Sequence, residues 1–176
     1  MISENAAAGA AFKLPPRVAG LLIIGVIGGQ HPPQEALALA ERVGELVAKS
    51  GSTLLCGGLG GVMEAACRGA KRGGGLTIGV LPGGDKHEAN PHVDIPIVTA
   101  MGTARNAIVV RSSDALIAID GSFGTLTEIG YALDLRKKVF ALRSWALPVD
   151  PTTREFYVAV TTPEEAVEKA IDEAGG

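Results

Sequence analysis

Short, continuous hydrophobic runs alternate along most of the chain with segments of helical periodicity. The continuous runs predict buried parallel strands, because a strand covered on both faces carries apolar side chains on both. These strands are expected at residues 18–27, 52–56, 76–81, 94–98, 115–119, 138–142 and 157–160. In the intervening segments, hydrophobic residues recur every three or four positions, as in amphipathic helices. The helices are expected at residues 34–49, 61–72, 103–112 and 122–136 and from Pro163 onward.

This alternation predicts an α/β fold, a Rossmann-like doubly wound parallel sheet with helices on both faces. We expect a single domain over residues 17–176, long enough for one hydrophobic core. Residues 1–16 are rich in small side chains and lack the long apolar region of a signal peptide, so a disordered tail is expected there. No apolar run reaches the ~18 residues of a membrane span. A cytoplasmic protein without a membrane partner is therefore expected.

Composition and charge limit the kinds of partner and of bound metal that the sequence predicts. Hydrophobic residues make up 47% of the chain and charged residues 20%, which is typical of a globular protein. The formal net charge of −3 argues against a nucleic-acid partner. Cys56 and Cys67 fit neither a metal-ligand spacing nor a disulfide framework, so both are expected as reduced core residues. The sequence shows no cluster of His, Cys and carboxylates that indicates a metal site.

A glycine-rich turn, D-G-S-F-G-T-L-T-E at residues 120–128, joins the expected strand at 115–119 to the following helix. Gly121 and Gly124 permit positive φ and a close approach of a ligand to the backbone. The free N–H groups of the first helical turn, with the positive end of the helix dipole behind them, form a phosphate site.

The phosphate-binding residues expected on this turn are Gly121, Ser122, Gly124 and Thr125, with Glu128 at the edge of the site. A structural interpretation is also open. The residues T-L-T-E at 125–128 fit a capping box, in which Glu128 would bond back to the start of the helix.

A second copy of this turn, C-G-G-L-G-G-V-M-E, occupies residues 56–64. Gly57, Gly60 and Glu64 stand where Gly121, Gly124 and Glu128 stand in the first copy, and Glu64 is read as a cap for its own helix. A third loop, Gly28-Gly29, ends the first strand. Because parallel strands present their carboxyl ends at one edge of the sheet, we expect one crevice lined by all three loops. The glycines expected to contact a ligand on the two additional loops are Gly28, Gly29, Gly57, Gly58, Gly60 and Gly61.

The loop after the first strand lacks the dinucleotide-binding fingerprint. Residues 25–30 read G-V-I-G-G-Q rather than G-x-G-x-x-G, and no acidic residue closes a second strand. We therefore do not expect a bound NAD.

Three motifs in order resemble the Lonely Guy (LOG) superfamily of Rossmann-like proteins, many of which are labelled lysine decarboxylase. The family signature P-G-G-x-G-T-x-x-E aligns with residues 120–128, where Asp120 and Ser122 replace Pro and the second Gly. The Arg-bearing stretch reads M-G-T-A-R-N at 101–106, with Asn106 in place of the usual Lys. The earlier family loop reads G-G-L-G-G-V-M at 57–63. The stretch R-S-S-D-A at 111–115 is closest to a prokaryotic branch that also resembles the molybdenum-cofactor carrier proteins.

This resemblance implies a small phosphorylated ligand and no required cofactor. In catalytic members it implies hydrolysis of the N-glycosidic bond of a nucleoside 5′-monophosphate. Glu128 would then stabilise the oxocarbenium-like transition state, and Arg105 would clamp the phosphate or the ribose hydroxyls. Met63 and Asn106 join the expected ligand-binding residues. Without the resemblance, Arg105 reads as a surface residue on an amphipathic helix.

A non-catalytic carrier that binds the molybdenum cofactor or a related phosphorylated pterin is the alternative, because it needs the same phosphate site. The ligand is therefore expected to be an AMP-like nucleotide, phosphate or the molybdenum cofactor. Arg111 is expected to be a structural or a phosphate-side partner. A DNA-processing protein on a related fold is disfavoured by the acidic balance. The resemblance also suggests a homodimer or homotetramer.

Overall fold

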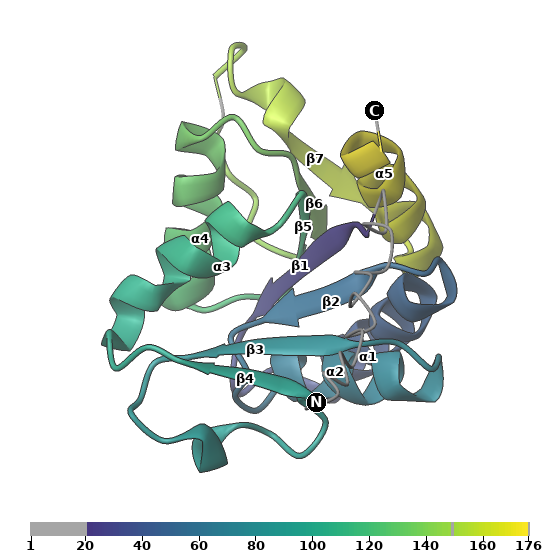
Figure 1. Ribbon diagram of the computed structural model, residues 1–176. Helices are drawn as coiled ribbons and strands as arrows, with labels where there is room; N and C mark the ends of the chain where they lie inside the picture. Colours follow the sequence, from purple (N-terminus) through teal and green to yellow (C-terminus); the bar gives the residue numbers. More distant parts are fainter. Residues whose placement is uncertain (1–20, 149, 176) are drawn as a thin grey trace, which may run out of the picture.

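The computed structural model describes residues 21–148 and 150–175. Its strands form one sheet in the order β4-β3-β2-β1-β5-β6-β7, and every neighbouring pair is parallel (Figure 1). The doubly wound parallel sheet expected from the sequence is thereby confirmed. The strands are β1 (Ile23–Gly28), β2 (Thr53–Cys56), β3 (Thr77–Leu81), β4 (Ile95–Val98), β5 (Ala115–Ile119), β6 (Val139–Leu142) and β7 (Tyr157–Val160).

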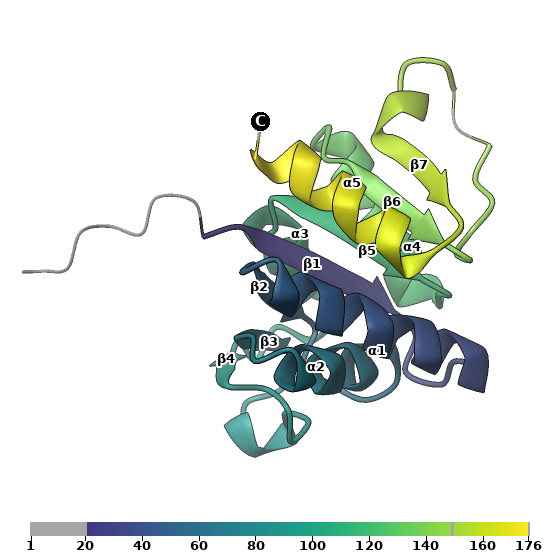
Figure 2. The same cartoon turned by 90° about the vertical axis from the view of Figure 1, so that its right-hand side faces the viewer.

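Helices cover both faces of this sheet and bury two hydrophobic layers. On one face, α1, α2 and α5 pack against Ile24 and Val26 of β1, and on the other α3 and α4 pack against Ile27 (Figures 1 and 2). Successive side chains of β1 point to opposite faces, as strand geometry requires. The helices are α1 (Gln34–Lys49), α2 (Val62–Arg72), α3 (Asn106–Ser112), α4 (Phe123–Asp134) and α5 (Pro163–Gly175), with 3₁₀ turns η1 (Lys86–Glu88), η2 (Gly102–Arg105) and η3 (Arg154–Phe156).

The observed elements differ from the expected ones mainly at their ends. The helix expected at 103–112 begins as the 3₁₀ turn η2, in which the Ala104 N–H donates to the Met101 carbonyl, and becomes α-helical at Asn106. Such a tighter first turn is common at helix starts. The tail expected at 1–16 and the first residues of the strand expected at 18–27 lie outside the described residues. In the described part of the chain, no helix is long and apolar enough to cross a membrane.

Strands β2, β3 and β4 are added on one side of β1, and the chain then crosses to the other side to add β5, β6 and β7. This reversal of strand order separates the two connections at the carboxyl ends of the strands and opens a crevice between them. The three glycine-rich loops follow β1, β2 and β5, so the sheet brings all of them to this crevice.

Candidate functional site

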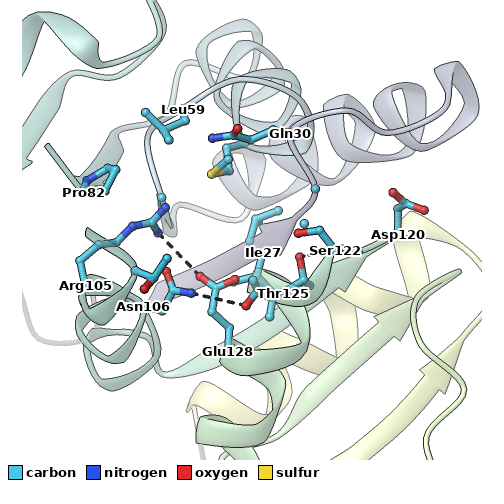
Figure 3. A pocket seen from close by; sticks show the side chains of 18 of the residues that line it. Ile27, Gln30, Leu59, Pro82, Arg105, Asn106, Asp120, Ser122, Thr125 and Glu128 are labelled. Carbon is cyan, nitrogen blue, oxygen red and sulfur yellow. Dashed lines mark hydrogen bonds and ion pairs between the residues drawn. The ribbon is translucent and has the colours of Figure 1, made fainter. Parts of the chain in front are cut away.

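A cavity of about 470 Å³ lies at this crevice, a size that suits a small-molecule ligand (Figure 3). The loops after β1, β2 and β5 form its walls together with η2 and the first turn of α4. The structure places the following sequence-predicted site residues in the cavity wall: Gly28, Gly29, Gly57, Met63, Arg105, Asn106, Gly121, Ser122, Gly124, Thr125 and Glu128.

Arg105 and Glu128 form an ion pair in this wall. Arg105 comes from the last residue of η2 and Glu128 from the second turn of α4, and Arg105 Nη1 lies 3.7 Å from Glu128 Oε1 (Figure 3). This distance is too long for a hydrogen bond. The two side chains are only 9% and 8% exposed. The site therefore holds two opposite charges, removed from water, that attract each other without a direct hydrogen bond.

Burial shifts the titration of this pair. Loss of hydration raises the pKa of the Glu128 carboxyl to about 7, and the positive charge of Arg105 opposes the shift only in part. Burial also lowers the pKa of the Arg105 guanidinium, which nevertheless stays protonated in proteins. Glu128 is thus a carboxyl group that changes charge near neutral pH in a cavity, as is typical of functional sites.

Gly57 makes the room in which the Arg105 guanidinium lies. A Cβ at position 57 would stand 2.3 Å from Nη1 and 2.4 Å from Nη2 of Arg105, so the guanidinium would have to move. Arg105 Nε is buried and has no hydrogen-bond partner among the described residues. A buried donor without a partner costs about 1–3 kcal/mol. An acceptor on a ligand in the cavity would remove this cost.

The start of α4 corrects one sequence-based interpretation. The capping box formed by Thr125 and Glu128 is wrong, because the N-cap is Ser122 and Thr125 is the third helical residue. The Ser122 N–H donates to Thr125 Oγ1 at 3.3 Å, and this pair forms the capping box instead. Glu128 lies a turn further along α4 and faces Arg105. The box leaves the backbone N–H groups of Phe123 and Gly124 without a hydrogen bond within the described residues.

Asn106 joins the two elements that carry the ion pair. It directly follows Arg105, and its Nδ2 donates to the carbonyl oxygen of Gly124 at 3.4 Å. The family's usual Lys is replaced here by a side chain that contacts the glycine-rich turn itself. Asn106 therefore helps to hold η2 against the start of α4.

Three expected ligand contacts on the turn at residues 56–64 do not line the cavity. They are Gly58, Gly60 and Gly61. Gly58 and Gly61 have φ of +75° and +69°, a left-handed backbone that favours glycine. A Cβ at Gly61 would also stand 2.4 Å from the Gly29 carbonyl oxygen. These two glycines shape the turn.

Two charged residues whose roles the sequence left open lie away from the cavity. Glu64 makes no side-chain hydrogen bond within the described residues, so its expected capping role finds no support. Arg111 is exposed at the last turn of α3, and its carbonyl accepts a hydrogen bond from Lys137.

The sequence analysis did not identify several other wall residues. Leu59, Pro82 and Asp120 line the cavity as well. Leu59 and Asp120 stand inside the two glycine-rich turns, which is the signal that marks them. Pro82 carries no such signal, because it reaches the cavity only through the position of β3.

Both cysteines are free and buried, as expected, and their Sγ atoms lie 3.5 Å apart. Within residues 21–148 and 150–175, no three His, Cys, Asp or Glu side chains gather closely enough to hold a metal ion.

Comparison with known proteins agrees with this fold. Residues 21–172 match the model of the SLOG cluster4 family. An uncharacterized protein of Archaeoglobus fulgidus is 47% identical over 86% of this chain and 95% of its own length. A cytokinin riboside 5′-monophosphate phosphoribohydrolase of Mycobacterium marinum is 34% identical over 65% of each chain.

Two solved structures match nearly their whole length. The molybdenum cofactor binding protein of Rippkaea orientalis superposes with a TM-score of 0.76 at 40% identity, over 86% of this chain and 96% of its own. The molybdenum cofactor carrier protein of Chlamydomonas reinhardtii superposes with a TM-score of 0.77 at 33% identity, over 88% and 99%.

The fold and the glycine-rich site thus define a Rossmann-like protein of the LOG-like superfamily, with a resemblance to molybdenum-cofactor carriers. Within that superfamily the chain belongs to the SLOG cluster4 family.

Proposed function

We propose that the protein binds a nucleoside 5′-monophosphate in the 470 Å³ cavity and hydrolyses its N-glycosidic bond. The observation that carries this proposal is the buried Arg105–Glu128 pair, which lies one helical turn beyond the free N–H groups at the start of α4. The similarity to phosphoribohydrolases acting on cytokinin riboside 5′-monophosphates supports the same class of reaction.

The start of α4 would hold the phosphate. The N–H groups of Phe123 and Gly124 are free there, and the helix dipole adds positive potential. Arg105 would donate its unpartnered Nε–H to a phosphate oxygen or a ribose hydroxyl. Hydrogen bonds from a charged donor are about twice as strong as neutral ones, so Arg105 would also orient the sugar over Glu128.

Glu128 would carry the chemistry. The bond between the sugar and the base breaks through an oxocarbenium-like transition state, and a nearby carboxylate stabilises its positive charge. The ionised carboxylate would accept a proton from the water that attacks the anomeric carbon. The electrons of the C–N bond leave with the base, which takes up a proton, and the products are the free base and ribose 5-phosphate.

Incubation with AMP tests this proposal. We expect adenine and ribose 5-phosphate in equal amounts, measured by chromatography, and at least about a hundredfold slower release of adenine by the Glu128→Gln variant. AMP that binds in calorimetry but stays intact would refute hydrolysis and leave binding as the function.

Non-catalytic carriage of the molybdenum cofactor is the second candidate. It is favoured because the molybdenum cofactor binding and carrier proteins match 86–88% of this chain, against 65% for the Mycobacterium marinum phosphoribohydrolase. The phosphate of such a pterin would take the same place at the start of α4. Since no metal-ligating cluster occurs in the described residues, the chain would hold this cargo through its phosphate and ring. Co-elution of the cofactor with the protein in gel filtration, without release of free base from AMP, would favour this function.

The same gel filtration, combined with light scattering, tests the expected homodimer or homotetramer.

A further inference from the structure

A second cavity, of about 220 Å³, adjoins the first at the turn that precedes α4. Asp120 and Gly121 line both cavities, so the two spaces meet at this turn. The remaining wall consists of Arg143, Ser144 and Trp145, in the segment that follows β6. The reaction proposed above uses only the larger cavity and gives this smaller one no role.

Several contacts hold the backbone of Ser144 and Trp145 close to the turn. A Cβ at Gly121 would stand 2.8 Å from Trp145 Nε1, so the absence of a side chain at position 121 lets the indole lie there. The Tyr157 hydroxyl donates to the Trp145 carbonyl at 2.6 Å, and Ser144 Oγ donates to the Asp120 carbonyl at 2.5 Å. Trp145 Nε1 is buried without a hydrogen-bond partner among the described residues. The indole therefore lies against Gly121 and keeps an unused donor.

Phe123 lies beside this indole, which lines the smaller cavity. Its side chain is 82% exposed although it is the first residue of α4, next to the proposed phosphate position. The Phe123 and Trp145 ring centroids lie 6.1 Å apart, with a 35° angle between the ring planes. An exposed aromatic ring beside a cavity offers a face on which a planar heterocycle can stack.

The backbone around this cavity is unusual in a way that agrees with a binding role. Asp120 and Arg143 both have positive φ, 53° and 52°, although neither is glycine. Residues in such sparsely populated conformations cluster at ligand sites. Arg143 also supplies an exposed guanidinium, ion-paired with Glu35, as the cation of this wall.

We propose that Phe123 and Trp145 form a second ring-binding subsite, and that the protein also accepts ligands in which the nucleoside monophosphate is joined through a pyrophosphate to a second nucleoside with a planar heterocycle. The inference rests on the phosphate position of the proposed function. A pyrophosphate at the start of α4 would direct one nucleoside toward Arg105 and Glu128 and the other toward Trp145. A nucleoside monophosphate fills only the larger cavity.

The fluorescence of Trp145 tests this subsite directly, because it is the only tryptophan in the chain. Wild-type protein is titrated with AMP and with two adenosines joined by a pyrophosphate. We expect the dinucleotide to quench the tryptophan emission and to bind at least about tenfold more tightly than AMP, given about 1–3 kcal/mol for one stacked base.

Phe123→Ala should remove most of that advantage and bring the two affinities to within about threefold. Tyr131→Ala is the matched control, since Tyr131 is an exposed aromatic residue two turns further along α4, outside both cavities. Equal affinities in the wild type, or an advantage that persists in Phe123→Ala, would overturn the inference. So would a change of oligomeric state in Phe123→Ala, because the exposed ring would then belong to a subunit contact.

The outcome for the proposed function is read separately. Intact AMP after incubation counts against hydrolysis, even when the dinucleotide binds and quenches the emission. Released adenine with equal affinities counts against the subsite alone, and binding of neither nucleotide overturns both.

Discussion

The two glycine-rich turns, at residues 56–64 and 120–128, share glycines at two matching positions, Gly57 with Gly121 and Gly60 with Gly124, and both end in a glutamate. Both follow a parallel strand and lead into a helix, but α4 begins at Phe123, three positions earlier in the shared pattern than Val62, where α2 begins. Their glutamates nevertheless differ. Glu128 is buried opposite Arg105, whereas Glu64 is partly exposed and has no side-chain hydrogen bond among the described residues.

The glutamates also occupy different helical positions, since Glu64 is the third residue of α2 and Glu128 the sixth of α4. A third segment, η2, which lies between the two turns in the sequence, supplies a partner to Glu128 only. Arg105 extends from η2 over Gly57 of the first turn and toward Glu128 of the second. The first turn thus contributes space, and the second contributes the carboxylate and the free N–H groups. The two similar motifs therefore have different roles in the site, because the Arg105 side chain contacts the glycine of one and the glutamate of the other.

The largest expected effect separates the two glutamates. Glu128→Gln should lower the rate of AMP hydrolysis by about 10²–10⁴-fold, because the neutral amide cannot stabilise a developing positive charge or accept the proton of water. Glu64→Gln, the same change in the turn at residues 56–64, should leave the rate of AMP hydrolysis within about twofold of the wild type. Single-turnover assays with AMP measure both. Full hydrolysis by Glu128→Gln would remove Glu128 from the mechanism.

The second prediction uses the pH dependence of stability. The folded chain has a Glu128 pKa of about 7 against the ordinary 4.5, so it binds this proton more tightly than the unfolded chain. The resulting stabilisation is fully present below pH 4.5 and is lost as the pH rises through 7. The free energy of unfolding should fall by about 3 kcal/mol between these limits because of this group. Urea unfolding at pH 4.5 and 8 measures it. Glu128→Gln should abolish this component and Glu64→Gln should retain it.

The same titration predicts the pH dependence of hydrolysis. The reaction needs the carboxylate form of Glu128, so kcat/KM should fall as the pH drops below about 7, the pKa of this group. A rate that is flat from pH 5 to pH 8 would mean that another group carries the reaction.

The third prediction compares two glycines of the first turn. Gly57→Ala places a methyl group 2.3 Å from Arg105 Nη1, whereas at Gly60 the nearest atom to such a methyl group, Glu64 Oε2, is 3.8 Å away. Displacement of the guanidinium should weaken AMP binding by about 1.5–3 kcal/mol, the usual contribution of a hydrogen bond to a charged group. Gly60→Ala should bind AMP as the wild type does. Calorimetry distinguishes the two, and equal affinities would show that Arg105 does not contact the ligand.

The smallest effect concerns the cap of α4. Thr125→Val removes the acceptor of the Ser122 N–H and should lower the free energy of unfolding by about 0.5–1.5 kcal/mol. Thr127→Val is the control, because the Thr127 hydroxyl is exposed and donates only to the carbonyl of Phe123. Denaturant unfolding at constant pH compares them. A larger loss for Thr127→Val would contradict the observed capping box.

The sheet was predictable because its strands are buried on both faces and therefore read as continuous apolar runs. The site was predictable in outline, since parallel topology brings the loops after β1, β2 and β5 to one edge. The cap was misread because T-L-T-E at 125–128 and S-F-G-T at 122–125 both have the spacing of a capping box. Only the start of α4 at Phe123, with the Ser122 N–H donating to Thr125 Oγ1, distinguishes them.

The functions of individual glycines could not be separated from the sequence. Gly57 is required for the position of Arg105, whereas Gly58 and Gly61 are required for a left-handed backbone. Trp145 was not identified as a site residue, because its position depends on the segment after β6, which carries no motif. The role of each glycine and the position of Trp145 both depend on packing between segments that are distant in the chain.

The packing of Arg105 on Gly57 links two positions that are far apart in the sequence. A related chain that bears any side chain at the position of Gly57 cannot keep its arginine where this chain holds it. Substitutions at the two positions should therefore covary during evolution, and a pairwise count in a large set of homologues would reveal it. Relatives that retain both residues would form one group, and those that have lost the glycine would bind their ligand with a differently built wall.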